Sequence, residues 1–243
     1  MKTSNPALSA KTFESQVGTS GETMTLQGTV NKTGILLFCA FATAAWSWQE
    51  AIANPQAAGG WMMAGVIGGL VLAIVTIFKK EWAAMTAPLY ALAEGLALGG
   101  ISAVFNQAYH GIALQAVEAT GAVTLVMLVL YTSRLVRATP KFTMGVIAAT
   151  GGIFVVYILD MFLGFFHSGV PLLNGNGPMG ILISVVIVGV AALNLILDFG
   201  FVETGVQAGA PKYMEWYGAF GIMVTLVWMY VEMLRLLSKL NSR

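Results

Sequence analysis

A few acidic residues interrupt long apolar stretches of this sequence. Asp198 lies in the run Leu195–Phe199, with Asn194 one helical turn before it. Glu203 follows the same run and Glu215 opens the next apolar stretch. If these stretches are helices, the three carboxylates should gather at neighbouring helix ends. Capping and contact with interfacial water would account for Glu203 and Glu215, but they account less well for Asp198.

Clustered carboxylates have two chemical properties that matter here. They offer the oxygen ligands that Ca²⁺ prefers, and like charges titrate as a coupled set. Asp198 and Glu215 are therefore the candidate Ca²⁺ ligands. We expect such a site to bind a cation at neutral pH and to release it on acidification.

Two further acidic residues lie in apolar surroundings. Glu94 precedes Gly95 and Gly99, which form a small-residue face that lets a neighbouring helix approach closely. A lysine or arginine could hold Glu94 at this packed interface, or Glu94 could line a cavity, and the sequence favours neither. Asp160 shares a helical face with His167. A metal pair is conceivable there, but a hydrogen-bonded structural aspartate is the preferred interpretation.

The composition indicates what surrounds these groups. Of the 243 residues, 57% are apolar and only 9% are charged, whereas soluble domains average about 25% charged residues. The net charge is +1 and no basic block occurs, so nucleic acid is not an expected partner. The single Cys39 excludes a disulfide within the chain and a zinc motif of paired cysteines. The sequence therefore predicts a polytopic membrane protein with the lipid bilayer as its partner.

The apolar stretches predict an all-α protein, because a membrane-spanning helix needs about 20 apolar residues. Alternation typical of a barrel strand is missing from them. The seven candidate segments are 33–50, 61–79, 87–108, 119–137, 142–166, 178–200 and 213–237. Residues 1–31 are predicted to be a polar, mobile tail, and residues 32–243 a single seven-helix transmembrane domain.

The positions of Lys and Arg predict the orientation. Three alternate breaks between segments are basic, and the breaks near 55, 113 and 172 hold no Lys or Arg. This pattern places the amino terminus in the cytoplasm. Seven spans then put Arg235, Lys239 and Arg243 outside; alternatively, the last segment is re-entrant and both termini are internal. We favour seven spans. The basic residues of the three breaks are Lys79, Lys80, Arg134, Arg137, Lys141 and Lys212.

Enzymatic motifs are not found. There is no phosphate-binding glycine loop and no zinc-protease motif. An aspartate pair could catalyse hydrolysis only within hydrogen-bond reach, and the predicted topology puts Asp160 and Asp198 near opposite membrane faces. The sequence therefore predicts that the protein is not an enzyme and has no cofactor.

Three motifs resemble the Bax inhibitor/YccA-like family in a divergent, bacterial-type form. They are Glu94–Ser102 after Pro88–Tyr90, Leu195–Phe199, and Met233–Leu237. The resemblance covers roughly residues 30–240. It implies seven helices with the last one central and the other six around it, and a pH-sensitive Ca²⁺ leak.

The resemblance also implies site residues. In the family, two aspartates on the last two helices share a proton and gate the pore, beside an arginine. Asp198 matches the first aspartate. The second would lie where this sequence reads Ile222–Leu226. Glu215 is the candidate substitute for the second aspartate, and Lys79 or Lys80 for the arginine.

Two functions follow as expectations. The first is a pH-sensitive cation (Ca²⁺) leak channel or exchanger of the bacterial inner membrane, gated by protonation of Asp198, Glu94, Glu215 and Glu203. The alternative is a non-conducting regulator that binds membrane proteins. YccA-like relatives are associated with modulating a membrane-bound protease through a cytoplasmic amino-terminal tail, and residues 1–31 would fill that role.

Overall fold

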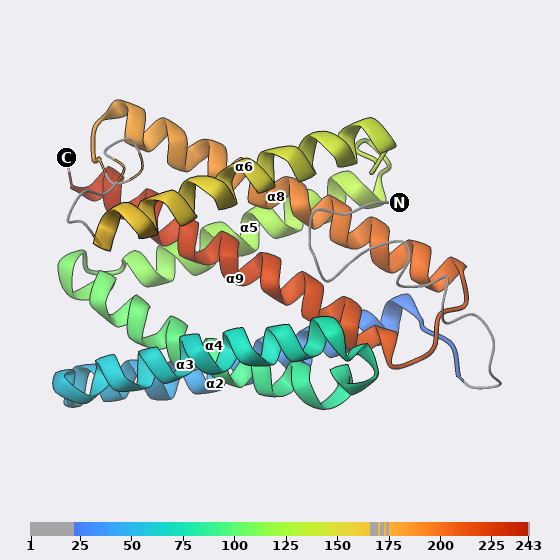
Figure 1. The fold of residues 1–243 in the computed structure, drawn as a ribbon, viewed down its shortest axis with the longest axis horizontal. Helices are drawn as coiled ribbons and strands as arrows, with labels where there is room; N and C mark the ends of the chain where they lie inside the picture. Colours follow the sequence, from blue (N-terminus) through green and yellow to red (C-terminus); the bar gives the residue numbers. More distant parts are fainter. Residues whose placement is uncertain (1–21, 166–169, 171–172, 174, 243) are drawn as a thin grey trace.

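The computed structural model describes residues 22–165, 170, 173 and 175–242. Within these residues, seven helices are long and apolar enough to cross a membrane, as predicted. Figure 1 shows them side by side along the long axis of the molecule. The helices are α2 (Leu26–Ala53), α3 (Pro55–Phe78), α4 (Ala83–Ala108, preceded by the short η1, Lys80–Trp82), α5 (Ile112–Thr132), α6 (Pro140–Phe165), α8 (Pro178–Gln207) and α9 (Met214–Asn241).

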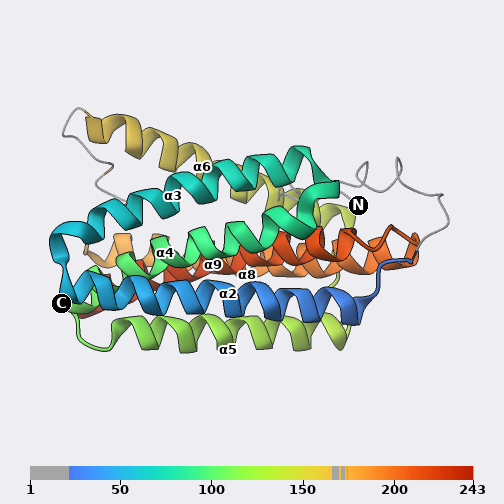
Figure 2. The ribbon, with the colours of Figure 1, turned by 90° about the horizontal axis from the view of Figure 1, so that it is seen from below.

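Helix α9 occupies the centre of the bundle. It packs against α2, α4, α5 and α8, whereas α3 packs on α4 and α2, and α6 packs on α8. Figure 2 shows α4, α9 and α8 as a middle layer between α3 with α6 on one side and α2 with α5 on the other. Over its most apolar stretch, α8 is 56% buried and α6 only 6%. The central position expected of the last helix is therefore seen, with α3 and α6 in an outer layer.

The first helix begins earlier than its apolar stretch. Helix α2 starts at Leu26 rather than at residue 33, so the end of the predicted tail is helical. The Thr25 hydroxyl caps the helix by accepting a hydrogen bond from the Gly28 amide at 2.9 Å. This polar start has its own hydrogen bonds, which a count of apolar residues does not detect. Residues 1–21 of the predicted tail lie outside the described residues.

The last two helices run further than predicted. Helix α8 continues to Gln207 instead of ending at residue 200. Helix α9 is continuous from Met214 to Asn241 and is not re-entrant. Because successive helices run in opposite directions, α2, α4, α6 and α9 start at one end of the bundle (Figure 1). We call it the basic end, after Lys79, Lys80, Arg134, Arg137 and Lys212 in its loops; the other is the opposite end.

Close packing of α2 on α4 depends on two glycines. A Cβ at Gly95 would overlap the Thr43 hydroxyl, and one at Gly99 would overlap the Ala44 carbonyl oxygen. The close approach lets Thr43 donate a hydrogen bond to the Leu92 carbonyl at 2.9 Å. The predicted small-residue contact is thus confirmed, with α2 as the neighbouring helix.

Residues Glu22–Thr25, which we call the N-terminal strap, lie along the loop between α8 and α9. The Met24 amide donates to the Ala210 carbonyl at 2.7 Å, and the Lys212 amide donates to the Glu22 carbonyl at 3.0 Å. The Glu22 carboxylate also accepts a hydrogen bond from the Lys212 ammonium, which raises the pKa of Lys212. The strap therefore ties the start of the described chain to the basic end.

Candidate functional site at the seam between α8 and α9

Helices α8 and α9 contact each other through one face of each helix, and on both faces the contacting residues are seven positions apart. Residues seven apart in an α-helix are about two turns apart and share a face. Two hydrogen bonds, from Thr225 to Asp198 and from Lys239 to Ser184, fix the antiparallel register. That register places Glu232 opposite the small Ala191. We call this contact the α8–α9 seam, made of Ser184, Ala191 and Asp198 on α8 and of Thr225, Glu232 and Lys239 on α9.

Asp198 is the acidic group of the seam nearer the basic end. It is fully buried, and its Oδ2 accepts a hydrogen bond from the Thr225 hydroxyl at 2.5 Å. Because α8 continues to Gln207, Asp198 lies about 14 Å from the helix end at 1.5 Å per residue. It is therefore deeper than the helix-end position that the sequence predicted. Thr225 lies in the stretch where the family resemblance would put a second aspartate.

Glu232 is the second buried carboxylate of the seam. Only 2% of it is exposed. The Tyr157 hydroxyl of α6 donates to Glu232 Oε1 at 2.6 Å, and Arg235 Nη1 donates to the Tyr157 oxygen at 2.7 Å and to Glu232 Oε1 at 3.4 Å. Among the described residues, Glu232 Oε2 has no hydrogen-bond partner. One carboxylate oxygen is thus held firmly and the other is left as an available acceptor.

Lys239 forms the end of the seam at the opposite end of the bundle. It is buried, and its ammonium donates to the carbonyl oxygens of Leu173 and Gly180 at 2.7 and 3.1 Å and to the Ser184 hydroxyl at 2.9 Å. An ammonium has three N–H donors, so these bonds use all of them. The cation therefore joins α9 to the first turns of α8.

Residues 5–242 match the family model described as Bax inhibitor 1 like. The chain belongs to the Bax inhibitor 1-like family. The match covers nearly the whole chain, so the seam, the strap and all seven helices lie within the family's domain. Comparisons with curated proteins and with solved structures find no significant match.

Glu215 of this family member does not join Asp198, which corrects the sequence prediction. Its Oε1 accepts hydrogen bonds from the Thr25 amide at 2.9 Å and from the Thr25 hydroxyl at 2.8 Å. Its Oε2 forms an ion pair with Lys32 of α2. Glu215 is fully buried, and its contacts tie the start of α9 to the N-terminal strap and α2.

Glu203 also has a separate partner. The Tyr131 hydroxyl of α5 donates a hydrogen bond to Glu203 Oε2. No group of three His, Cys, Asp or Glu side chains within the described part of the chain could hold a metal ion. The predicted cluster of Asp198, Glu203 and Glu215 is therefore wrong, because each carboxylate faces a different helix.

Glu94 lies at the contact between α3 and α4. A Cβ at Gly69 would come within 2.7 Å of Glu94 Oε1, and the Tyr90 phenol, one turn earlier on α4, lies beside the Glu94 carboxylate. Its described partner is a phenol rather than the lysine or arginine of the interface hypothesis. Lys79 is exposed, and the Lys80 ammonium lies 5.9 Å from the centre of the Tyr217 ring. The arginine-like role suggested for these lysines is not seen.

The two secondary polar residues connect helices. The Asn194 side-chain amide donates to the Thr150 hydroxyl of α6 at 2.9 Å, as well as to the Val190 carbonyl. Asp160 Oδ1 accepts a hydrogen bond from the Val170 amide at 2.7 Å, so Asp160 is hydrogen-bonded, as the preferred interpretation expects. His167, the other member of the conceivable metal pair, lies outside the described residues.

Several candidate residues of the seam were not singled out from the sequence. The spacing of Thr225, Glu232 and Lys239 was a usable signal, because seven-residue intervals put polar side chains on one face of a helix. Tyr157 and Lys32 gave no such signal, since their partners are far away in the sequence. Only the fold brings these residues to Glu232 and Glu215.

Proposed function

We propose that this protein is a pH-sensitive leak pathway for Ca²⁺, with Asp198 as the group whose protonation controls it. The observation that carries the proposal is a fully buried carboxylate, about 14 Å from the end of a membrane-spanning helix, bonded to the central helix. The free-energy cost of burying an ionisable group deep in the membrane ranges from about 2.5 to more than 10 kcal/mol. Such groups are rare inside membrane helices and typically belong to ion or proton pathways.

The chemistry of the seam supports a cation as the transported species. Ca²⁺ takes oxygen ligands, and the seam presents Asp198 with Thr225 at one level, Glu232 further along α9, and Ser184 beyond it. Glu232 is seven residues from Thr225, about 10.5 Å further along α9. A cation moving along the seam would meet one carboxylate near the basic half and another near the opposite half. Arg235 is paired with Glu232, so its side chain would have to move away from Glu232 before the cation could bind there.

Because Asp198 faces Thr225, we expect the proposed switch to respond to one proton. A threonine hydroxyl can donate to a carboxylate but does not titrate in the physiological range. The residue across the seam from Asp198 is therefore a hydroxyl, where the family resemblance implies a second carboxylate that shares the proton. We expect a single proton on Asp198 to change its contact with Thr225. The ionised carboxylate can accept hydrogen bonds but cannot donate one, whereas the neutral acid has an O–H donor as well.

The basic end supports a cytoplasmic amino terminus. Its loops carry Lys79, Lys80, Arg134, Arg137 and Lys212, whereas the described loops at the opposite end carry no Lys or Arg. Positively charged loops favour the cytoplasmic side. We propose that the protein lies in a bacterial inner membrane with the N-terminal strap in the cytoplasm.

We expect Asp198→Asn to change Ca²⁺ flux at neutral pH by at least tenfold and to remove its dependence on pH. Asparagine keeps an oxygen that accepts from Thr225 but carries neither the charge nor the titratable proton. The measurement is Ca²⁺ entry into proteoliposomes that hold the purified protein and a trapped Ca²⁺ indicator.

Glu118→Gln is the matched control, because Glu118 is exposed on α5 and its neutralisation should leave flux at the wild-type level. Glu232→Gln tests the second carboxylate of the seam separately. Equal flux for wild type and Asp198→Asn at every pH would reject the role of Asp198. Flux no greater than that of empty liposomes would reject the leak pathway altogether.

The N-terminal strap supports a second candidate function, a non-conducting regulator of another membrane protein such as a protease. Backbone hydrogen bonds fix residues Glu22–Thr25 to the loop between α8 and α9, so the first described residues are anchored at the basic end. Deleting residues 1–21 should leave Ca²⁺ flux unchanged if the seam conducts. Loss of a cellular phenotype in that truncation, with flux retained, would favour the regulator.

A further inference from the structure

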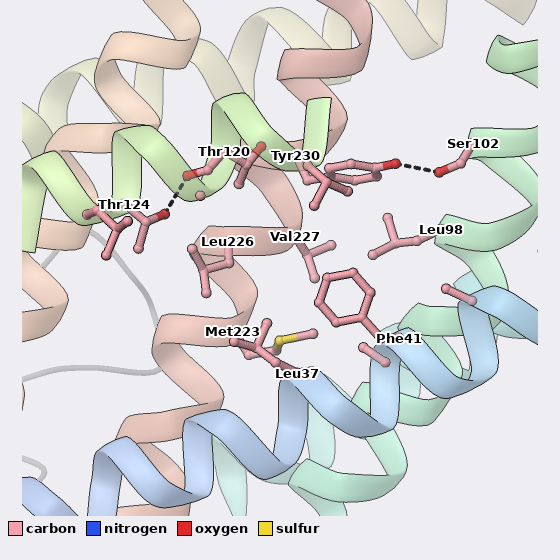
Figure 3. Close-up of a pocket in the computed structure, with 15 residues that line it drawn as sticks. Leu37, Phe41, Leu98, Ser102, Thr120, Thr124, Met223, Leu226, Val227 and Tyr230 are labelled. Carbon is pink, nitrogen blue, oxygen red and sulfur yellow. Dashed lines mark hydrogen bonds between the residues drawn. The ribbon is translucent and has the colours of Figure 1, made fainter. Parts of the chain in front are cut away.

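A pocket of about 370 Å³ lies between α2, α4, α5 and α9. Figure 3 shows it bordered by Leu37 and Phe41 of α2, Leu98 and Ser102 of α4, and Met223 of α9 among others. Its volume falls within the range of small-molecule sites, roughly 300–1,000 Å³. The seam is separate from it: Asp198, Glu232 and Lys239 do not line it.

The pocket is continuous with the lipid-facing surface. Phe41 and Leu125 line it and are 55% and 64% exposed. Gly121 of α5 also lines the pocket and is exposed. These residues belong to α2 and α5, both of which are long and apolar enough to cross the membrane. The pocket therefore opens sideways, into the hydrocarbon of the bilayer rather than into water.

The lining changes character along the membrane normal. Toward the basic end it is mainly apolar, with Leu37, Met223 and Leu226. Thr124 also lines this half, but its hydroxyl already donates to the Thr120 carbonyl at 2.7 Å. Toward the opposite end it has hydroxyl groups: Ser102 and Tyr230 are hydrogen-bonded at 2.7 Å, and Thr120 is 8% exposed. Of the described residues, none is a hydrogen-bond partner of the buried Thr120 hydroxyl.

We propose that the pocket holds one acyl chain of a membrane phospholipid. The chain enters between α2 and α5 from the leaflet at the opposite end of the bundle. Its terminal methyl group points toward Leu37 and Met223. The part nearest the ester lies toward Ser102 and Tyr230, because one of their two hydroxyl protons joins the pair and the other can be donated to a carbonyl oxygen. A phospholipid chain has one long apolar part and an acceptor at one end, which matches the two halves of the lining.

The test uses phosphatidylcholine that carries a photoreactive diazirine, either near the terminal methyl of one chain or near its carbonyl. The full-length protein is placed in nanodiscs with each lipid, irradiated and mapped by mass spectrometry. We expect the probe near the terminal methyl to label residues at the depth of Leu37 and Met223. The probe near the carbonyl should label residues at the depth of Val117 and Ser102.

Gly121→Leu is the blocking variant. A Cβ at Gly121 meets no atom within 4 Å, so the larger side chain can extend into the mouth without displacing the backbone. Leucine also favours a helix more than glycine does. We expect labelling inside the pocket to fall at least tenfold, with a smaller loss in Gly121→Ala. Gly151→Leu is the matched control on α6, because Gly151 is exposed and also has open space around it.

Four results would overturn the proposal. The first is labelling that shows no order with depth, and the second is labelling that persists in Gly121→Leu at the Gly151→Leu level. The third is labelling of the pocket by a free diazirine fatty acid but not by the phospholipid. Cross-links from pocket residues to a second copy of the chain, in place of lipid, would make the pocket an interface between copies and would equally reject the bound acyl chain.

Discussion

Replacing Lys32 by methionine should lower the free energy of unfolding by about 3 kcal/mol. Lys32 forms an ion pair with the fully buried Glu215, and removing one partner of a buried pair leaves an uncompensated charge. We expect the lower end of the range for such pairs, because this one lies near the helix ends at the basic end. Glu215 also receives two hydrogen bonds from Thr25, so the N-terminal strap should loosen as well. Thermal unfolding in detergent measures the loss.

Two further variants test this explanation. The double variant Lys32→Met with Glu215→Gln should recover much of the stability, since the buried charge is gone. Lys212→Met is the control, because Lys212 pairs with Glu22 where both side chains are largely exposed, and such pairs contribute little. If Lys32→Met and Lys212→Met unfold at the same temperature, the buried pair does not anchor α9.

Replacing Arg235 by methionine should also cost about 3 kcal/mol, because it removes the only cation paired with Glu232 among the described residues. Arg235 supports the Tyr157 hydroxyl, which in turn holds Glu232 Oε1. Both links are lost together, while the carboxylate stays buried. The free energy of unfolding, measured with denaturant in detergent, should fall accordingly.

Replacing the other partner, Glu232, should reduce the free energy of unfolding much less. In Glu232→Gln the side-chain oxygen still accepts from Tyr157, and Arg235 keeps its bond to the Tyr157 hydroxyl and is less buried than Glu232, with about a third of its side chain exposed. We expect a loss of about 1 kcal/mol, the size of an ordinary hydrogen bond. Equal losses for Arg235→Met and Glu232→Gln would contradict the view that the unpaired buried carboxylate sets the cost.

The membrane fold could be predicted from the sequence because one strong signal determines it. Seven apolar stretches of sufficient length leave few alternatives in a bilayer, where only helices and closed barrels satisfy the backbone. Asp198 could be singled out for a related reason, since a charge in an apolar stretch needs an explanation. The small face of Gly95 and Gly99 also predicted a close helix contact, which α2 provides.

The partners of the carboxylates could not be predicted in the same way. Asp198 and Glu215 are both near the loop between α8 and α9 in sequence, but which way each faces depends on helix rotation and helix length. Two more turns of α8 bury Asp198 against Thr225. Glu215 instead pairs with Lys32, which lies just before the first predicted segment, 33–50, on the part of α2 that this segment leaves out. Partners distant in the sequence leave no local pattern.

The central claim is that one buried carboxylate, Asp198, controls cation flux, and its most direct test is the pH dependence of Ca²⁺ flux in proteoliposomes. The account predicts that wild-type flux follows the titration of a single proton, because Thr225 replaces a second carboxylate. Flux through Asp198→Asn should be flat with pH and should equal the wild-type value at the acidic limit, where Asp198 is neutral. A steeper, two-proton curve, or a pH dependence that survives in Asp198→Asn, would contradict it.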